Sequence, residues 1–144
     1  MISIYLTLLG VIVSDQVLKQ LLRRVMGPGV APLGPFGQIR VGEGRLWLRR
    51  LHSPSSRFVP WALWTAAALA LMLASRWLPS SEIFIGLLLG GSLSNAADDS
   101  RYGSVNDYIC LRFWPAFNLA DLAIAVGAIG TLVELLTTVR GAAS

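Results

Sequence analysis

Two polar pairs with the same spacing stand at the ends of apolar stretches in this sequence. Asn95 precedes Asp98 by three residues, and Asn118 precedes Asp121 by three, so in a helix each amide would share a face with its carboxylate. Asp107 lies between the two pairs. Two carboxylates held close together do not both ionise easily, so one can act as a general base on water while the other, protonated, donates to a carbonyl. The spacing leaves open which two acids pair, but the chemistry is hydrolysis without a metal, thiol or cofactor.

The second pair also has a simpler explanation. An asparagine N-cap followed by an acid three residues later resembles a capping box, and both groups suit the positive end of the helix dipole. Capping alone would therefore explain Asn118 and Asp121. It does not explain Asp98, because an acid at a helix C-terminus opposes the dipole. We therefore expect five acids to converge on one side of the membrane: Asp15, Asp98, Asp99, Asp107 and Asp121.

The first apolar stretch carries Asp15 and, four residues later, Lys19, which can pair on one helix face. An acid near the membrane midplane costs roughly 2.5 to 3.5 kcal/mol on insertion scales, so Asp15 must face the other helices or lie near a helix end. It is either half of a structural ion pair or an anchor beneath a polar site. Metal binding by oxygen ligands is a rival, which the basic neighbours Lys19 and Arg101 disfavour. Since Cys110 and His52 are single residues of their type, a Cys/His metal cluster is excluded.

The elements that would position these residues are apolar. Of 144 residues, 54% are hydrophobic and 14% are charged, which lies outside the usual soluble range. Four stretches approach the roughly 17 to 25 residues needed to cross the hydrocarbon core, and they cover about residues 2–22, 58–75, 83–98 and 119–139. The composition predicts an all-α membrane protein, a bundle of four transmembrane helices that forms one integral domain over residues 1–144.

The segment of about residues 25–57 has a different composition. Gly and Pro come first, followed by the alternating stretch QIRVGEGRLWLRRL, which is typical of short strands. We expect a small β-sheet at the membrane surface between the first two helices. Residues 23–57 hold seven arginines against the single acid Glu43, which suits anionic phospholipid and not nucleic acid, since no soluble domain carries the patch. The positive-inside rule alone would keep this segment in the cytoplasm.

Four motifs of the chain resemble those of the bacterial lipoprotein signal peptidases, or signal peptidase II, which are four-span aspartyl proteases. The motifs are DQVLK at residues 15–19, SNAADD at 94–99, RYGSVNDY at 101–108 and FNLAD at 117–121. The resemblance covers essentially the whole chain. It implies a monomeric enzyme without a cofactor in the bacterial plasma membrane. Its active site would face the outer, periplasmic side, which places the arginine-rich segment outside, against the positive-inside rule.

The resemblance also implies roles for individual residues. The catalytic pair would be Asp107 and Asp121. The residues that support this pair or the substrate would be Asn95, Asp98, Asn118, Asp15, Lys19 and Arg101. The implied reaction is endoproteolysis that removes the signal peptide from a lipid-modified prolipoprotein, just before a diacylglyceryl-modified cysteine.

Three features depart from the family pattern. Residues 51–58, LHSPSSRF, replace the asparagine-glycine motif that precedes the second helix, Asp99 replaces an arginine, and Ser94 replaces a glycine. These changes permit a specialised paralogue with another client. Two other classes of function are a non-catalytic binder of lipidated peptides, or of an inhibitor that mimics them, and a small transporter that uses the acids as a proton relay. The presence of both Asp107 and Asp121 argues against a pure binder, because burying two acids together is costly and binding alone would not require it.

Overall fold

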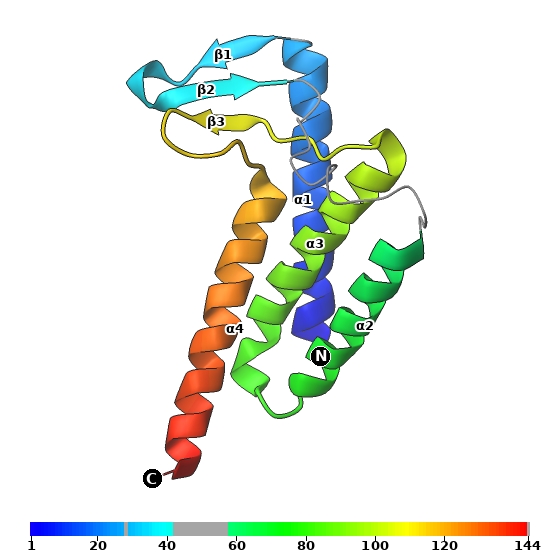
Figure 1. Ribbon diagram of the computed structural model, residues 1–144, viewed down its shortest axis with the longest axis vertical. Helices are drawn as coiled ribbons and strands as arrows, with labels where there is room; N and C mark the ends of the chain where they lie inside the picture. The colour runs from blue at the N-terminus through cyan, green and yellow to red at the C-terminus, as the bar shows by residue number, and fades with distance from the viewer. Residues whose placement is uncertain (28, 42–57, 144) are drawn as a thin grey trace.

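The computed structural model describes residues 1–27, 29–41 and 58–143. The body of this described part consists of four long helices (Figure 1): α1 (Ile2–Met26), α2 (Phe58–Ala74), α3 (Glu82–Tyr102) and α4 (Leu119–Ala143). The shorter elements are the strands β1 (Val30–Pro32), β2 (Gly37–Arg40) and β3 (Ile109–Leu111) and the 3-10 turns η1 (Gly34–Phe36) and η3 (Pro79–Ser81). The helices agree with the four predicted stretches, although α1, α3 and α4 each extend about one turn further.

Helix α3 packs closely against both α1 and α4, and two adjacent glycines permit this. A Cβ atom on Gly90 would lie 2.7 Å from the backbone oxygen of Leu8 in α1. A Cβ atom on Gly91 would collide with the backbone oxygen of Ala120 in α4. Small residues in an apolar helix allow such backbone approaches, so this pair of glycines fixes the spacing of three helices.

Helix α2 joins the bundle through apolar packing and indole hydrogen bonds. Ala68 from α2 lies in a buried cluster with Ile4, Ile85 and Leu89. Trp64 Nε1 donates to Ser92 Oγ at 2.9 Å, which ties α2 to the middle of α3. The bundle interior is thus apolar around Ala68 and Leu89. The polar residues of the network described below lie nearer the C-terminal end of α3.

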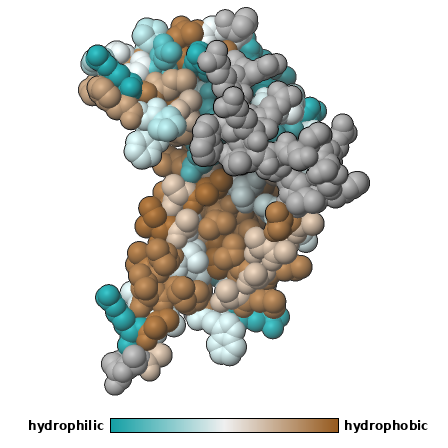
Figure 2. Space-filling view, viewed as in Figure 1, coloured by the Kyte–Doolittle hydropathy of each residue, from teal (hydrophilic) through white to brown (hydrophobic). Residues whose placement is uncertain are grey.

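The outer surface of the helices is also apolar. Leu6 and Val17 of α1 and Ile129 of α4 are more than half exposed, and hydrophobic residues cover the helical part of the face in Figure 2. Helix α1 and residues Leu119–Ala142 of α4 are long and apolar enough to cross a membrane, whereas the apolar part of α2, Trp61–Ala74, is shorter. The number of described helices fits the predicted bundle, while their number of membrane crossings stays a prediction.

The small antiparallel sheet has the order β1-β2-β3 and lies beyond one end of the bundle (Figure 1). Strands β1 and β2 come from the segment predicted to form it. The prediction was incomplete, however, because β3 comes from the connection between α3 and α4, where Gln38 pairs with Cys110. Three residues give too short an alternation for a strand to be identified from sequence. This third strand positions Asp107, two residues before it.

Candidate active site

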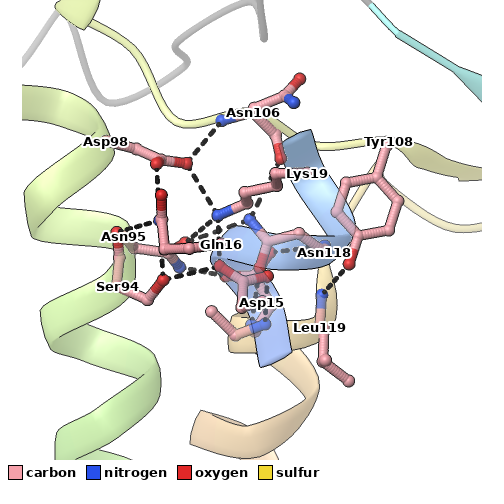
Figure 3. A network of polar contacts seen from close by, with 12 residues as sticks. Asp15, Gln16, Lys19, Ser94, Asn95, Asp98, Asn106, Tyr108, Asn118 and Leu119 are labelled. Carbon is pink, nitrogen blue, oxygen red and sulfur yellow. Dashed lines mark hydrogen bonds and ion pairs between the residues drawn. The ribbon is translucent and has the colours of Figure 1, made fainter. Parts of the chain in front are cut away.

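The polar residues of three helices and one loop meet in a single network at the sheet end of the bundle. Figure 3 shows side chains from α1, α3, the loop before β3 and the start of α4 pointing toward one another. Most residues of this network are buried. Its six fully or almost fully buried polar residues are Asp15, Lys19, Ser94, Asp98, Asn106 and Asn118.

Strand β3 brings Asp107 to the start of α4. Ile109 and Phe117 form an antiparallel bridge, with N–H···O distances of 2.9 and 3.0 Å in the two directions. The residues just outside that bridge are therefore adjacent. The Tyr108 hydroxyl accepts a hydrogen bond from the backbone N–H of Leu119 at 3.0 Å, and Asn118 Nδ2 donates to Asp107 Oδ1 at 3.0 Å.

Asp121 is held by Asn118 and Asn95. The backbone N–H of Asn118 donates to Asp121 Oδ2 at 3.0 Å, and the backbone N–H of Asp121 donates to Asn118 Oδ1 at 2.9 Å. These two bonds form the reciprocal capping box. The second carboxylate oxygen, Oδ1, accepts from Asn95 Nδ2 at 2.7 Å. The same carboxylate thus caps α4 and takes part in the polar network.

The two asparagines join the aspartates into one unit. Asn118 Nδ2 donates to Asn95 Oδ1 at 3.1 Å as well as to Asp107. Asp107 is half-buried, and loss of hydration raises its pKa from 3.8 to about 6, with the negative charge of Asp121 as the second cause. Asp107 therefore keeps its proton up to about pH 6, well above the usual range of an aspartate.

An ion cluster lies beside this unit. Lys19 Nζ is 2.6 Å from Asp15 Oδ2 and 2.7 Å from Asp98 Oδ2, and it also approaches Asn95 Oδ1 at 3.5 Å. A bare buried carboxylate would be costly, and the shared ammonium group offsets that cost for both acids. Since Lys19 occupies the space between them, a metal ion bound there would have to displace it.

The cluster also links α1 to α4. Asp15 Oδ1 accepts from the backbone N–H of Ala120 at 3.2 Å, one residue before Asp121. Ser94 Oγ donates to Asp15 Oδ2 at 2.7 Å. Gln16 Nε2 donates to Asp98 Oδ1 at 2.9 Å and to Ser94 Oγ at 3.0 Å. These bonds fix the first turn of α4, and with it Asp121, relative to α1 and α3.

Most of the predicted site residues thus come together. The predicted Arg101 does not join them, and neither does the acid Asp99. Asp99 and Arg101 are exposed, and the Arg101 guanidinium lies 5.7 Å from the centre of the Tyr102 ring. The altered segment at residues 51–57 lies outside the described residues. Asp99 thus lies at the same end of α3 as Asp98, but outside the network.

Four residues of the network escaped the sequence-based choice of site residues: Gln16, Ser94, Asn106 and Tyr108. The backbone of Asn106 donates to Asp98 Oδ2 at 3.4 Å and accepts from Asn118 Nδ2 at 3.5 Å. Burial raises the pKa of Tyr108 to about 12, so it stays neutral. Each of these four residues is adjacent in sequence to a predicted one and lies within one of the quoted motifs, and these are the signals that could have identified them.

These features define a class: a helical membrane protein with paired aspartates at one end of its bundle. The sequence model of one family, described as signal peptidase (SPase) II, matches residues 7–137. The chain belongs to this family, as its motifs indicated, and is thus an integral bacterial membrane protein.

Relatives and solved structures agree with this family. A lipoprotein signal peptidase of Syntrophomonas wolfei is 36% identical over 105 residues, which cover 65% of this chain and 70% of that protein. One of Moorella thermoacetica is 42% identical over 73 residues, or 48% of this chain and 49% of the relative, so the chain spans about half of that protein's length. A solved structure titled as a bacterial membrane enzyme has a TM-score of 0.80 at 22% identity and covers 98% of this chain and 92% of its own. At that identity it supports the fold alone.

Proposed function

We propose that this protein is a membrane aspartyl endopeptidase that removes signal peptides from lipid-modified prolipoproteins. Cleavage falls before a diacylglyceryl-modified cysteine. One observation carries the proposal: Asn118 is hydrogen-bonded to Asp107 through its side chain and to Asp121 through its backbone. An arrangement that serves only to cap α4 would not need Asp107.

The reaction begins with one proton shared by the two aspartates. Asp121 accepts hydrogen bonds at both carboxylate oxygens, whereas loss of hydration raises the pKa of Asp107 to about 6. We therefore assign the proton to Asp107 in the resting enzyme. Asp121 removes a proton from water, the hydroxyl oxygen attacks the scissile carbonyl carbon, and Asp107 donates its proton to the carbonyl oxygen.

The tetrahedral intermediate then collapses. Asp121, now protonated, gives its proton to the departing amide nitrogen, and Asp107 recovers a proton from the intermediate's hydroxyl group as the new carboxyl end forms. The carbon–nitrogen bond breaks, and the aspartates return to their starting state with one water consumed. Asn95 and Asn118 hold the carboxylates in place throughout, so that little reorganisation accompanies the chemistry.

The lipid environment and the orientation belong to the same proposal. Exposed apolar side chains on α1 and α4 contact the acyl chains, and the sheet lies at the outer, periplasmic surface beside the aspartates. A lipidated substrate can then keep its acyl chains in the bilayer while its peptide reaches Asp107 and Asp121. The enzyme acts as a monomer, since one chain supplies both aspartates, and it needs no cofactor.

The proposal is tested with purified full-length protein in detergent and a diacylglyceryl-modified prolipoprotein. Asp107→Asn and Asp121→Asn should each lower kcat at least about 10³-fold, as expected when a catalytic group is lost. Asp99→Asn is the matched control, because this acid is exposed and outside the network; its kcat should stay near that of the parent. Cleavage that survives either dyad substitution would rule out this mechanism. Binding of the substrate without cleavage by the parent protein would indicate a non-catalytic binder.

A further inference from the structure

Helices α1 and α3 run side by side with a constant offset in sequence. Asp15 contacts Ser94, Lys19 pairs with Asp98, and the Arg23 guanidinium lies 4.4 Å from the centre of the Tyr102 ring. Each contact is four residues beyond the previous one on both helices. The first two contacts are buried, whereas Tyr102 is 48% exposed, so the series reaches the protein surface at Arg23 and Tyr102.

The surface end of this series carries two cations on one aromatic ring. The Arg101 guanidinium lies 5.7 Å from the same ring centre. Neither arginine forms an ion pair within the residues that the structure describes, where the recorded salt bridges involve only Met1, Glu82, Lys19, Asp15 and Asp98. Asp99 is the nearby acid on α3 and is exposed. The favourable position of basic residues in the last turn of a helix explains their presence but not their convergence from two helices.

The depth of the site along α1 indicates which ligand it meets. Arg23 directly follows the first apolar stretch, about residues 2–22, which approaches the roughly 17 to 25 residues that a helix needs to cross the hydrocarbon core. The hydrocarbon core is about 30 Å thick, so Arg23 lies at the level of the lipid head groups. A half-exposed tyrosine suits this interfacial level, and a guanidinium group forms paired hydrogen bonds with phosphate oxygens.

We propose that Arg23, Arg101 and Tyr102 form a binding site for the phosphate of an anionic phospholipid, beside the candidate active site. Tyr102 holds the two guanidinium groups by cation–π contact, and the arginines contact the phosphate. The site is separate from the proposed peptidase reaction, because it requires membrane insertion but no substrate. Its failure would leave the assignment of Asp107 and Asp121 unchanged.

The test is lipid retention by the full chain in detergent, measured by native mass spectrometry during titration with phosphatidylglycerol or with phosphatidylcholine. The parent protein should retain phosphatidylglycerol preferentially. Arg23→Gln and Arg101→Gln should each weaken its apparent affinity about fivefold, as expected for one arginine at an anionic surface, and the double variant more than tenfold. Arg24→Gln is the matched control, an exposed arginine next to Arg23, and should change the affinity less than twofold.

Two further variants test the ring and the local charge. Tyr102→Phe keeps an aromatic face and should retain the lipid, whereas Tyr102→Leu should lose it to the same extent as one arginine variant. Asp99→Asn removes a nearby negative charge and should strengthen retention. Glycerol phosphate in excess should not displace the lipid if the acyl chains contribute, and displacement would indicate a site for free phosphate instead. Equal retention by the parent and the double variant, or an equal loss in Arg24→Gln, would overturn the proposal.

Discussion

Asn118 Nδ2 donates to Asp107 Oδ1 at 3.0 Å, while the backbone N–H of the same asparagine donates to Asp121 Oδ2 at 3.0 Å. One residue at the start of α4 therefore fixes both members of the proposed pair. Its side-chain oxygen serves the helix, by accepting from the backbone N–H of Asp121 at 2.9 Å, and its amide nitrogen serves the second aspartate. These two roles can be separated by substitution.

Asn118→Ser should separate them, because serine is a good N-cap but lacks an amide group that reaches Asp107. We expect kcat on a lipidated precursor to fall about 10²-fold or more, a typical loss for a displaced catalytic group, with little change in melting temperature. Asn118→Ala, which loses the cap as well, should also be less stable by about 1 kcal/mol. Equal activity of Asn118→Ser and the parent would contradict the positioning role of the amide.

The pH dependence follows from the raised pKa of Asp107. Its pKa rises from 3.8 to about 6 on folding, so between these values the folded protein binds more protons than the unfolded chain. The free energy of unfolding therefore falls as pH rises through this window. Asp107→Asn should melt at a higher temperature than the parent at pH 7.5, and the difference should vanish near pH 3.5. In the parent, kcat/KM should decline above about pH 6, where Asp107 loses its proton. An advantage of Asp107→Asn that persists unchanged at pH 3.5 would contradict this origin.

Ser94 stabilises the buried ion cluster. Its hydroxyl donates to Asp15 Oδ2 at 2.7 Å and is fully buried, and a hydrogen bond to a charged group contributes about 1.5 to 3 kcal/mol. Ser94→Ala should lower the melting temperature by several degrees. Thr137→Ala is the matched control, since the Thr137 hydroxyl is exposed and bonds only to the backbone of Glu134. Equal melting of Ser94→Ala and the control would show that Lys19 and the backbone N–H of Ala120 hold Asp15 without the Ser94 hydroxyl.

Gly90 tests the close packing of α3 against α1. Its added Cβ would lie 2.7 Å from the backbone oxygen of Leu8, so Gly90→Ala should separate the helices and lower stability by about 1 to 3 kcal/mol, the usual cost of overpacking. Gly10→Ala provides the control, because a Cβ there meets no atom within 4 Å. That variant should be neutral or slightly more stable, since alanine favours a helix over glycine. Thermal unfolding in one detergent compares the two.

The sequence by itself determined the helices and most of the site's membership. A long apolar stretch in a membrane must form a helix, because only a helix satisfies its backbone hydrogen bonds within the stretch itself. The equal spacing of Asn95 with Asp98 and of Asn118 with Asp121 predicted that the two members of each pair lie on one helix face. A small sheet in the segment of residues 25–57 was also predictable, because part of that segment alternates. These are local properties, set by residues a few positions apart.

Tertiary structure alone decided which groups meet. The bridge between Ile109 and Phe117 places Asp107 beside Asn118, and it depends on a three-residue strand that pairs with β2, about 70 residues earlier in the chain. The same packing directs Lys19 to Asp15 and Asp98 and leaves Arg101 outside the network, on Tyr102. Spacing in the sequence specifies the face of one helix, whereas contacts between helices depend on how closely their backbones approach, which glycines such as Gly90 set.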